Sequence, residues 1–312
     1  IMPSLVGSEM CIRDRVITDR QDDLMKISPG EGTWELRKAI AMHLASFRDM
    51  QVTPGQIIIG AGTEYMYSLL IQLLGRDKVY CVEDPGYSKI ARIYASNNVK
   101  FCYAGMDAEG MKPEAVRECM ADIVHISPTH HYPTGITMPV SRRFELLAWA
   151  NEKPDRYIIE DDYDSEFRMT GKTIPTMKSI DINEKVIYMN TFSRTLTPTI
   201  RISYMVLPPH LAATYQEKLD FYACTVSNFE QYLNMLDKCT MITGRRDLYK
   251  TNGTDVKEQI DTIKSRVDGS NPKILFIRTS SSSVKAKQSE GSVGGEICLL
   301  YTSDAADDTP CV

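Results

Sequence analysis

The stretch IIIGAGTEYMYSLL, residues 57–70, joins a short apolar run to a longer segment in which apolar residues recur at helical spacing. The run Ile57 to Gly60 predicts a buried strand, and residues 64–74 predict a helix. Small residues between the two let backbone N–H groups approach a phosphate at the positive end of the helix. Turn glycines are common, so a dinucleotide, or no ligand at all, explains this stretch equally well.

The same alternation of strand and helix continues on both sides of this stretch. Upstream, Thr33 can cap a helix that places Leu36, Ile40, Leu44 and Phe47 on one face. Downstream, we expect helices at 88–96, 113–120 and 141–152 and strands at 79–82, 100–103, 123–126, 157–159, 186–189 and 202–207. Short apolar strands separated by helices predict an α/β fold, a doubly wound and mostly parallel sheet covered on both faces.

The composition excludes several classes of protein. The chain has 312 residues, of which 43% are hydrophobic and 25% are charged, and its formal net charge is −5. No apolar run approaches the roughly 20 residues that span a bilayer, so we expect a cytoplasmic protein without a membrane partner. The charge gives no broad basic surface for nucleic acid, so we expect this chain itself not to bind DNA.

Both ends of the chain match translations of one transposase sequencing adapter. The matches are SLVGSEMCIRD at residues 4–14 and CLLYTS at 298–303, read from opposite strands of the adapter. We therefore expect residues 1–15 and 298–312 to be non-native and the natural reading frame to be truncated at both ends. We expect one large domain over residues 16–240 and an uncertain remainder, truncated or out of frame, over 241–297.

Three of the 8 cysteines fall in these end segments. The others, Cys81, Cys102, Cys119, Cys224 and Cys239, show neither paired metal spacing nor a dense disulfide framework. Buried free thiols are the simpler interpretation, and we expect no metal site.

Two further segments follow predicted strands, where open α/β sheets bind ligands. Residues 83–87, EDPGY, offer an aromatic face that can stack on a flat heterocycle, although a turn with a partly buried tyrosine explains them as well. Residues 127–135, SPTHHYPTG, hold two histidines close to His125. Because the histidine spacing matches no common zinc pattern, we do not expect a metal there.

Acidic residues gather in a fourth segment, EDDYDSE at residues 160–166, after a predicted strand. A carboxylate at a strand end can pair with a protonated ring nitrogen, and a tyrosine two residues later points to the same face and can bond a ring oxygen. A calcium loop is the competing interpretation, but the segment lacks the glycine and the spacing of a known calcium loop.

In this order along the chain, these segments resemble one family. The strings VEDPGY (82–87), PTHHYPTG (128–135), IIEDDYDSEF (158–167) and TFSRTLTPTIRISYMVLP (191–208) resemble the MocR branch, regulators of the GntR family that carry an aminotransferase class I/II domain. The resemblance covers residues 28–235. It implies pyridoxal 5'-phosphate (PLP) as the cofactor. It also implies the fold-type-I large domain of aspartate aminotransferase-like transferases, with a seven-stranded type of sheet between helices.

The resemblance also implies a role for each matching residue. Gly62, Thr63, Glu64, Ser193 and Arg201 would hold the cofactor phosphate, since a guanidinium suits a phosphate group. Around the ring, Tyr87 would stack near the pyridine, Asp161 would pair with the pyridinium nitrogen, Tyr163 would bond the phenolic oxygen, and His131 and Tyr132 would line the other side.

Arg194 departs from the family pattern, which usually has TFSKTL where this chain has TFSRTL. The family's lysine forms a Schiff base with PLP, but arginine stays protonated and supplies no neutral amine. Non-covalent PLP binding is still compatible with arginine, and Lys172 and Lys185 lie outside the matching loop. Arg194 is either genuine or the product of a single A-to-G change in a lysine codon.

Two functions stay open after the resemblance, and a third ranks far behind. The first is a PLP-dependent aminotransferase of amino acids, whose catalysis Arg194 makes doubtful. The second, which we favour, is the effector- and cofactor-sensing domain of a regulator that responds to an amino acid or amine. The third, a nucleotide-dependent enzyme, rests on Gly60 to Gly62 and lacks a ribose-binding acid. The intact protein would be a homodimer that reaches DNA through a winged-helix domain before residue 16, with a small domain beyond residue 240.

Overall fold

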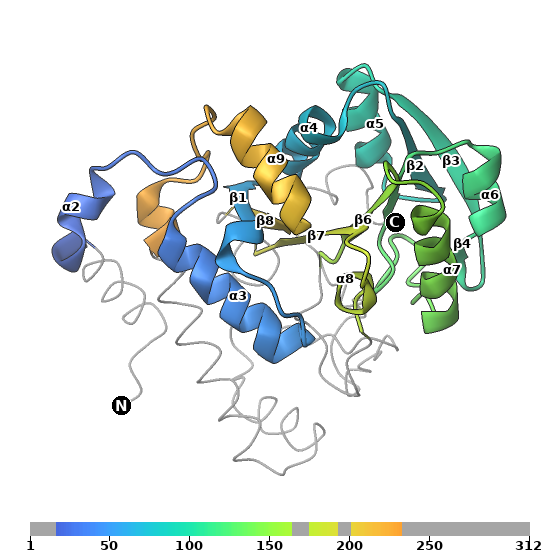
Figure 1. Cartoon of the computed structure of the whole chain (residues 1–312), viewed down its shortest axis with the longest axis horizontal. Helices are drawn as coiled ribbons and strands as arrows, with labels where there is room; N and C mark the ends of the chain where they lie inside the picture. Colours follow the sequence, from blue (N-terminus) through green and yellow to red (C-terminus); the bar gives the residue numbers. More distant parts are fainter. Residues whose placement is uncertain (1–16, 164–174, 193–200, 233–312) are drawn as a thin grey trace, which may run out of the picture. The chain divides into compact units, whose positions relative to one another are not determined.

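The computed structural model describes residues 17–163, 175–192 and 201–232. These residues build an eight-stranded sheet in the order β1-β8-β7-β6-β5-β2-β3-β4 (Figure 1). The strands are β1 (Ile57–Ala61), β2 (Val79–Asp84), β3 (Lys100–Asp107), β4 (Gly110–Met111), β5 (Ile123–Ile126), β6 (Tyr157–Asp161), β7 (Val186–Thr191) and β8 (Ile202–Val206).

The centre of the sheet is parallel. Strands β3, β2, β5, β6 and β7 form four parallel pairs, whereas β8 runs antiparallel to both β7 and β1, and β4 runs antiparallel to β3. Parallel neighbours need crossover connections, which the helices α5 (Ser88–Ser96), α6 (Pro113–Glu118) and α7 (Val140–Asn151) provide. The predicted α/β fold with a mostly parallel sheet is confirmed.

Helices cover both faces of the sheet. Figure 1 shows α4 (Thr63–Leu74), α5 and α9 (Pro209–Leu219) on one side and α3 (Trp34–Arg48), α7 and α8 (Met177–Ile180) on the other. Neighbouring residues of a strand point to opposite faces, so Ile159 packs in the core beneath α4, α5 and α9, and Ile158 in the core beneath α6 and α7. Apolar runs such as Ile57–Ile59 are therefore buried on both sides.

Several elements lie beyond the sequence prediction. The helices α2 (Gln21–Leu24), α8 and α9 and the two-residue strand β4 were not predicted. The elements β4, α2 and α8 are too short to carry a periodic pattern. Helix α9 does carry one, because Leu211, Tyr215 and Leu219 recur every four residues and are buried.

Two strands extend further than predicted, and both extensions carry acidic residues. Strand β2 continues to Asp84 because its pairing with β3 continues, and β6 continues to Asp161 because it pairs with β7 as far as Met189. The sheet itself therefore holds the backbone of Glu83, Glu160 and Asp161, which the prediction had placed in loops.

The predicted domain boundaries at residues 15, 240 and 297 lie outside the described residues. Across the described ranges, no helix combines the length and the apolar character needed to cross a membrane.

Candidate functional site

The predicted ligand-binding residues gather at one edge of the sheet. The parallel strands β2, β5, β6 and β7 all end at this edge. Because β8 is antiparallel to β7 and to β1, β1 also ends there and β8 begins there. Gly62, directly after β1, and Arg201, directly before β8, thus meet the carboxyl ends of the parallel strands, where open α/β sheets bind ligands.

Gly62 and the start of α4 form a positively polarised corner of this edge. Gly62 has φ 87°, in the left-handed region, and a Cβ atom there would lie 2.8 Å from Arg201 Nη2 and 2.8 Å from Glu64 Oε2. A side chain at this position would therefore be strained and would displace the groups that surround it. The N–H groups of the first turn of α4, which starts at Thr63, carry the positive end of the helix dipole.

Two basic side chains meet at Glu64. Lys89 Nζ donates to Oε1 over 2.6 Å and Arg201 Nη2 donates to Oε2 over 2.9 Å. Partial burial raises the pKa of Glu64, but the hydrogen bond from Lys89 and the charges of Lys89 and Arg201 outweigh it, so the net shift is downward. The ionised Glu64 holds two cations beside the N-terminus of α4. Lys89, in the first turn of α5, was not predicted to take part.

Asp161 lies at the end of β6 and is 6% exposed. The Tyr67 hydroxyl donates to its Oδ2 over 2.6 Å, and His125 Nε2 lies 3.8 Å from the same oxygen. The other oxygen, Oδ1, is buried and has no hydrogen-bond partner among the described residues. A buried carboxylate oxygen without a donor is costly, and a protonated ring nitrogen would satisfy it.

Tyr67 connects the two halves of this edge. It lies on α4 one turn after Thr63, and hydrogen bonds link it to Thr63 and Asp161. Burial, followed by the charge of Asp161, raises the pKa of Tyr67 well above its usual value, so the hydroxyl stays a donor. Its helical spacing from Thr63 was a signal in the sequence that our prediction did not use.

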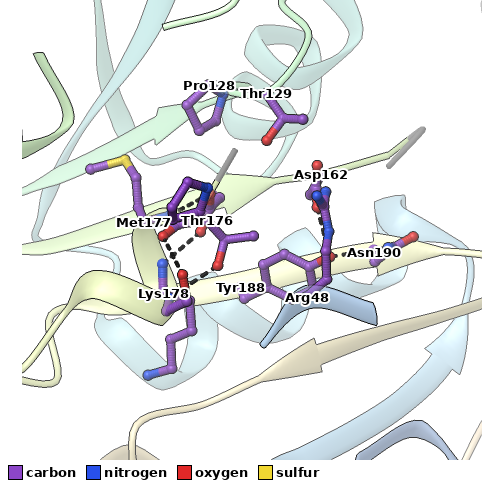
Figure 2. A network of polar contacts seen from close by, with 12 residues as sticks. Arg48, Pro128, Thr129, Asp162, Thr176, Met177, Lys178, Tyr188 and Asn190 are labelled. Carbon is purple, nitrogen blue, oxygen red and sulfur yellow. Dashed lines mark hydrogen bonds and ion pairs between the residues drawn. The ribbon is translucent and has the colours of Figure 1, made fainter. Parts of the chain in front are cut away.

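Asp162 takes a different direction from its neighbour Asp161. Figure 2 shows Arg48 and Tyr188 meeting it, and Arg48 forms a buried ion pair with Oδ2 while the Tyr188 hydroxyl donates to the same oxygen over 2.8 Å. Asn190 in turn donates to the Tyr188 hydroxyl over 3.1 Å. Of the two adjacent acids, Asp161 faces α4 and Asp162 ties β6 to the end of α3.

Glu83, at the end of β2, forms a second buried acidic position. Its Oε2 accepts the N–H of Ser127 over 3.1 Å and lies 3.4 Å from His131 Nε2. Burial raises the pKa of Glu83 to about 8, and burial lowers the pKa of His131. His131 Nδ1 is also hydrogen-bonded to Thr134 Oγ1 at 2.7 Å, so the structure places His131 beneath the edge, against Glu83.

Aromatic side chains frame the same edge. Tyr87 and Tyr132 meet edge to face with ring centroids 5.8 Å apart, and Tyr132 is 43% exposed. Tyr163 stacks on His130 with centroids 6.2 Å apart. Such faces suit a planar ring. Tyr87 and Tyr132 are thus brought together as predicted for one site, whereas Ser193 and Arg194 lie outside the described residues.

Comparison with known proteins places this arrangement in context. No family model matches the chain. It is 38% identical over 200 residues to the uncharacterised HTH-type transcriptional regulator YdeL of Bacillus subtilis, covering 64% of this chain and 43% of YdeL. It is 33% identical over 202 residues to the probable rhizopine catabolism regulatory protein MocR of Rhizobium meliloti, covering 64% and 39%. The chain thus spans less than half the length of either relative.

Solved structures share the fold. The multiple substrate aminotransferase of Thermococcus profundus superposes with a TM-score of 0.67 at 27% identity, covering 77% of this chain and 62% of that protein. The similarity extends over the sheet and its covering helices.

Proposed function

Because this chain is a homologue of the MocR-type transcriptional regulators and has the fold of the PLP-dependent aminotransferases, we propose that it binds PLP as the effector-sensing part of such a regulator. The observation that carries this proposal is the unpartnered Oδ1 of the buried Asp161. The Thr63–Tyr67 hydrogen bond links that carboxylate to the helix start beside Arg201. An acid for a ring nitrogen and a basic corner for a phosphate therefore belong to one bonded unit.

The basic corner fits the phosphate of PLP. In this proposal the N–H groups of Gly62, Thr63 and Glu64 and the side chain of Arg201 receive the phosphate oxygens. Lys89, held by Glu64 over 2.6 Å, adds a second positive charge that the family resemblance did not predict. Ser193 completes this corner as implied by the family pattern.

The acidic end fits the pyridine ring. Asp161 would pair with the ring nitrogen through Oδ1, Tyr163 would bond the phenolic oxygen, and Tyr87 would stack near the ring. When bound, PLP supplies an electron sink for chemistry at an amino group. Asp161 holds the proton on the ring nitrogen, while Tyr67 and His125 keep the carboxylate oriented.

Position 194 favours sensing over turnover. Arginine stays protonated and offers no neutral amine for a covalent bond to the cofactor. We therefore propose that PLP binds reversibly and non-covalently, and that an amino acid or amine acts as the effector. A free-standing aminotransferase of amino acids is the second candidate, favoured by the similarity to the Thermococcus profundus aminotransferase.

A binding experiment on the chain and its Arg194→Lys variant tests this proposal. We expect the parent chain to bind PLP, seen by absorbance, and to release it on dialysis. The lysine variant should retain PLP after borohydride reduction, seen as a mass increase of one reduced cofactor. Absence of PLP binding in both chains would overturn the proposal. Sustained amino-group transfer by the parent chain would favour the aminotransferase.

We propose further that the whole protein is a cytoplasmic homodimer and reaches DNA through a helix-turn-helix domain outside this chain. The relatives named as regulators are more than twice as long as the part that this chain spans. The net charge of −5 gives this part no electrostatic footprint for DNA. A gel-shift assay should find DNA binding in a product of the unbroken reading frame and none in this chain, and binding by this chain would contradict the proposal.

A further inference from the structure

Three cysteines that lie far apart in the sequence meet at the other end of the sheet. Cys81 lies on β2, Cys102 on β3 and Cys119 directly after α6. Parallel pairing sets Cys81 and Cys102 opposite each other in register. The three sulfur atoms all lie within 4.8 Å of one another. We refer to these residues as the thiol cluster.

The distances suit a single bound ion. Sulfurs held by one zinc-sized ion at about 2.3 Å lie roughly 4 Å apart, so a small contraction of the thiol cluster would bring all three onto the ion. A disulfide would use two of the sulfurs and leave the third. The sheet register and the end of α6 already hold the three donors together, which reduces the ordering that binding requires.

The surroundings also suit a thiolate-bound ion. Cys81 is fully buried beside Val124 and Ala104, while Cys102 and Cys119 are partly exposed at the margin of the same core. Within the part of the chain that the structure describes, the cluster includes no histidine or carboxylate. Three sulfur donors select soft ions and disfavour magnesium and calcium.

We propose that Cys81, Cys102 and Cys119 form a binding site for one thiophilic metal ion, such as Zn²⁺ or Cu⁺, held by three thiolates. The site lies on β2, β3 and the end of α6, apart from the cofactor edge. The bound ion would cross-link these three elements. Binding displaces the thiol protons into solvent, and no electron is transferred.

The test uses the full chain, reduced with a phosphine, with Zn²⁺ and Cd²⁺ as probes. Native mass spectrometry counts the bound Zn²⁺, and the thiolate charge-transfer absorbance of Cd²⁺ reports sulfur coordination. We expect one ion per chain at the cluster and a higher thermal midpoint with Zn²⁺. Cys102→Ser and Cys119→Ser should each lower the affinity by about 100-fold or more.

Cys224→Ser is the matched control, because Cys224 is a partly buried free cysteine outside the cluster. It should bind the ion as the parent does. The two cluster variants alter partly exposed positions, and circular dichroism identifies any that misfold, so either folded variant decides the test. Unchanged binding in a folded cluster variant, or no uptake by the reduced parent, would overturn the proposal. A disulfide within the cluster under mild oxidation, without metal uptake after reduction, would also overturn it.

Discussion

The Asp161 carboxylate has two unequal oxygens. Tyr67 fixes Oδ2 over 2.6 Å, and Oδ1 has no partner among the described residues. A hydrogen bond to a charged group contributes about 1.5–3 kcal/mol, so Tyr67 keeps Asp161 ionised and oriented despite its burial. In the proposed site, Tyr67 acts through Asp161 and is a positioning residue.

We therefore expect Tyr67→Phe to weaken PLP binding by about 10-fold, which corresponds to about 1.4 kcal/mol. The substitution removes one hydroxyl and leaves the ring in place. A titration of PLP followed by absorbance gives the affinity. Tyr65→Phe is the matched control, because Tyr65 lies on the same helix and packs against the core. Equal losses of affinity in both variants would show that the Tyr67 bond has no specific role.

At the scale of elements, a buried ion pair connects α3 to β6. Arg48 and Asp162 are almost fully buried, with side-chain exposures of 1% and 0%. Tyr188 adds a bond from β7 to the same carboxylate. Because Asp161 directly precedes Asp162, this connection also fixes the strand end that carries the proposed ring-binding acid.

Arg48→Met should destabilise the fold by about 3–5 kcal/mol, because it leaves the Asp162 charge buried without its partner. The double variant with Asp162→Asn should recover part of this loss, since an amide can still accept from Tyr188. Urea unfolding measures both. Arg117→Met, which breaks the exposed Arg117–Glu152 pair at 2.5 Å, should cost less than about 1 kcal/mol. A loss of that smaller size at Arg48 would contradict the predicted coupling.

The elements also show what the sequence could reveal. The alternation of apolar strands and helices predicted the parallel sheet, and strand-end positions predicted that Gly62, Tyr87, Asp161 and Arg201 would share one edge. The sequence could not reveal Lys89 at Glu64 or Cys81 opposite Cys102, because both depend on pairing register and side-chain direction. Asp161 and Asp162 have the same chemistry in the sequence, and only the strand direction separates their partners.

For the molecule as a whole, buried carboxyls set the pH dependence of stability. Burial raises the pKa of Glu83 to about 8 and that of Glu160 to about 7, from the ordinary glutamate value of 4.5. Between the ordinary and the raised values the folded state holds protons that the unfolded chain has released. Rising pH therefore favours unfolding across this window, and stability should fall between about pH 5 and pH 8.

Glu83→Gln should remove part of this decline, because the amide keeps a neutral group at the position and does not titrate. His131 opposes the decline in the parent: burial lowers its pKa below 6.5, so deprotonation of the unfolded chain raises stability as pH approaches that value. The difference between variant and parent, measured by urea unfolding across this pH range, isolates the effect of replacing Glu83. It should widen in favour of the variant as pH rises, by up to a few kcal/mol at about 1.36 kcal/mol per pKa unit. Glu35→Gln, at an exposed position, should follow the parent curve. If the Glu83→Gln curve also runs parallel to the parent, Glu83 ionises in the folded chain at the same pH as in the unfolded one, and burial at the end of β2 does not control its proton.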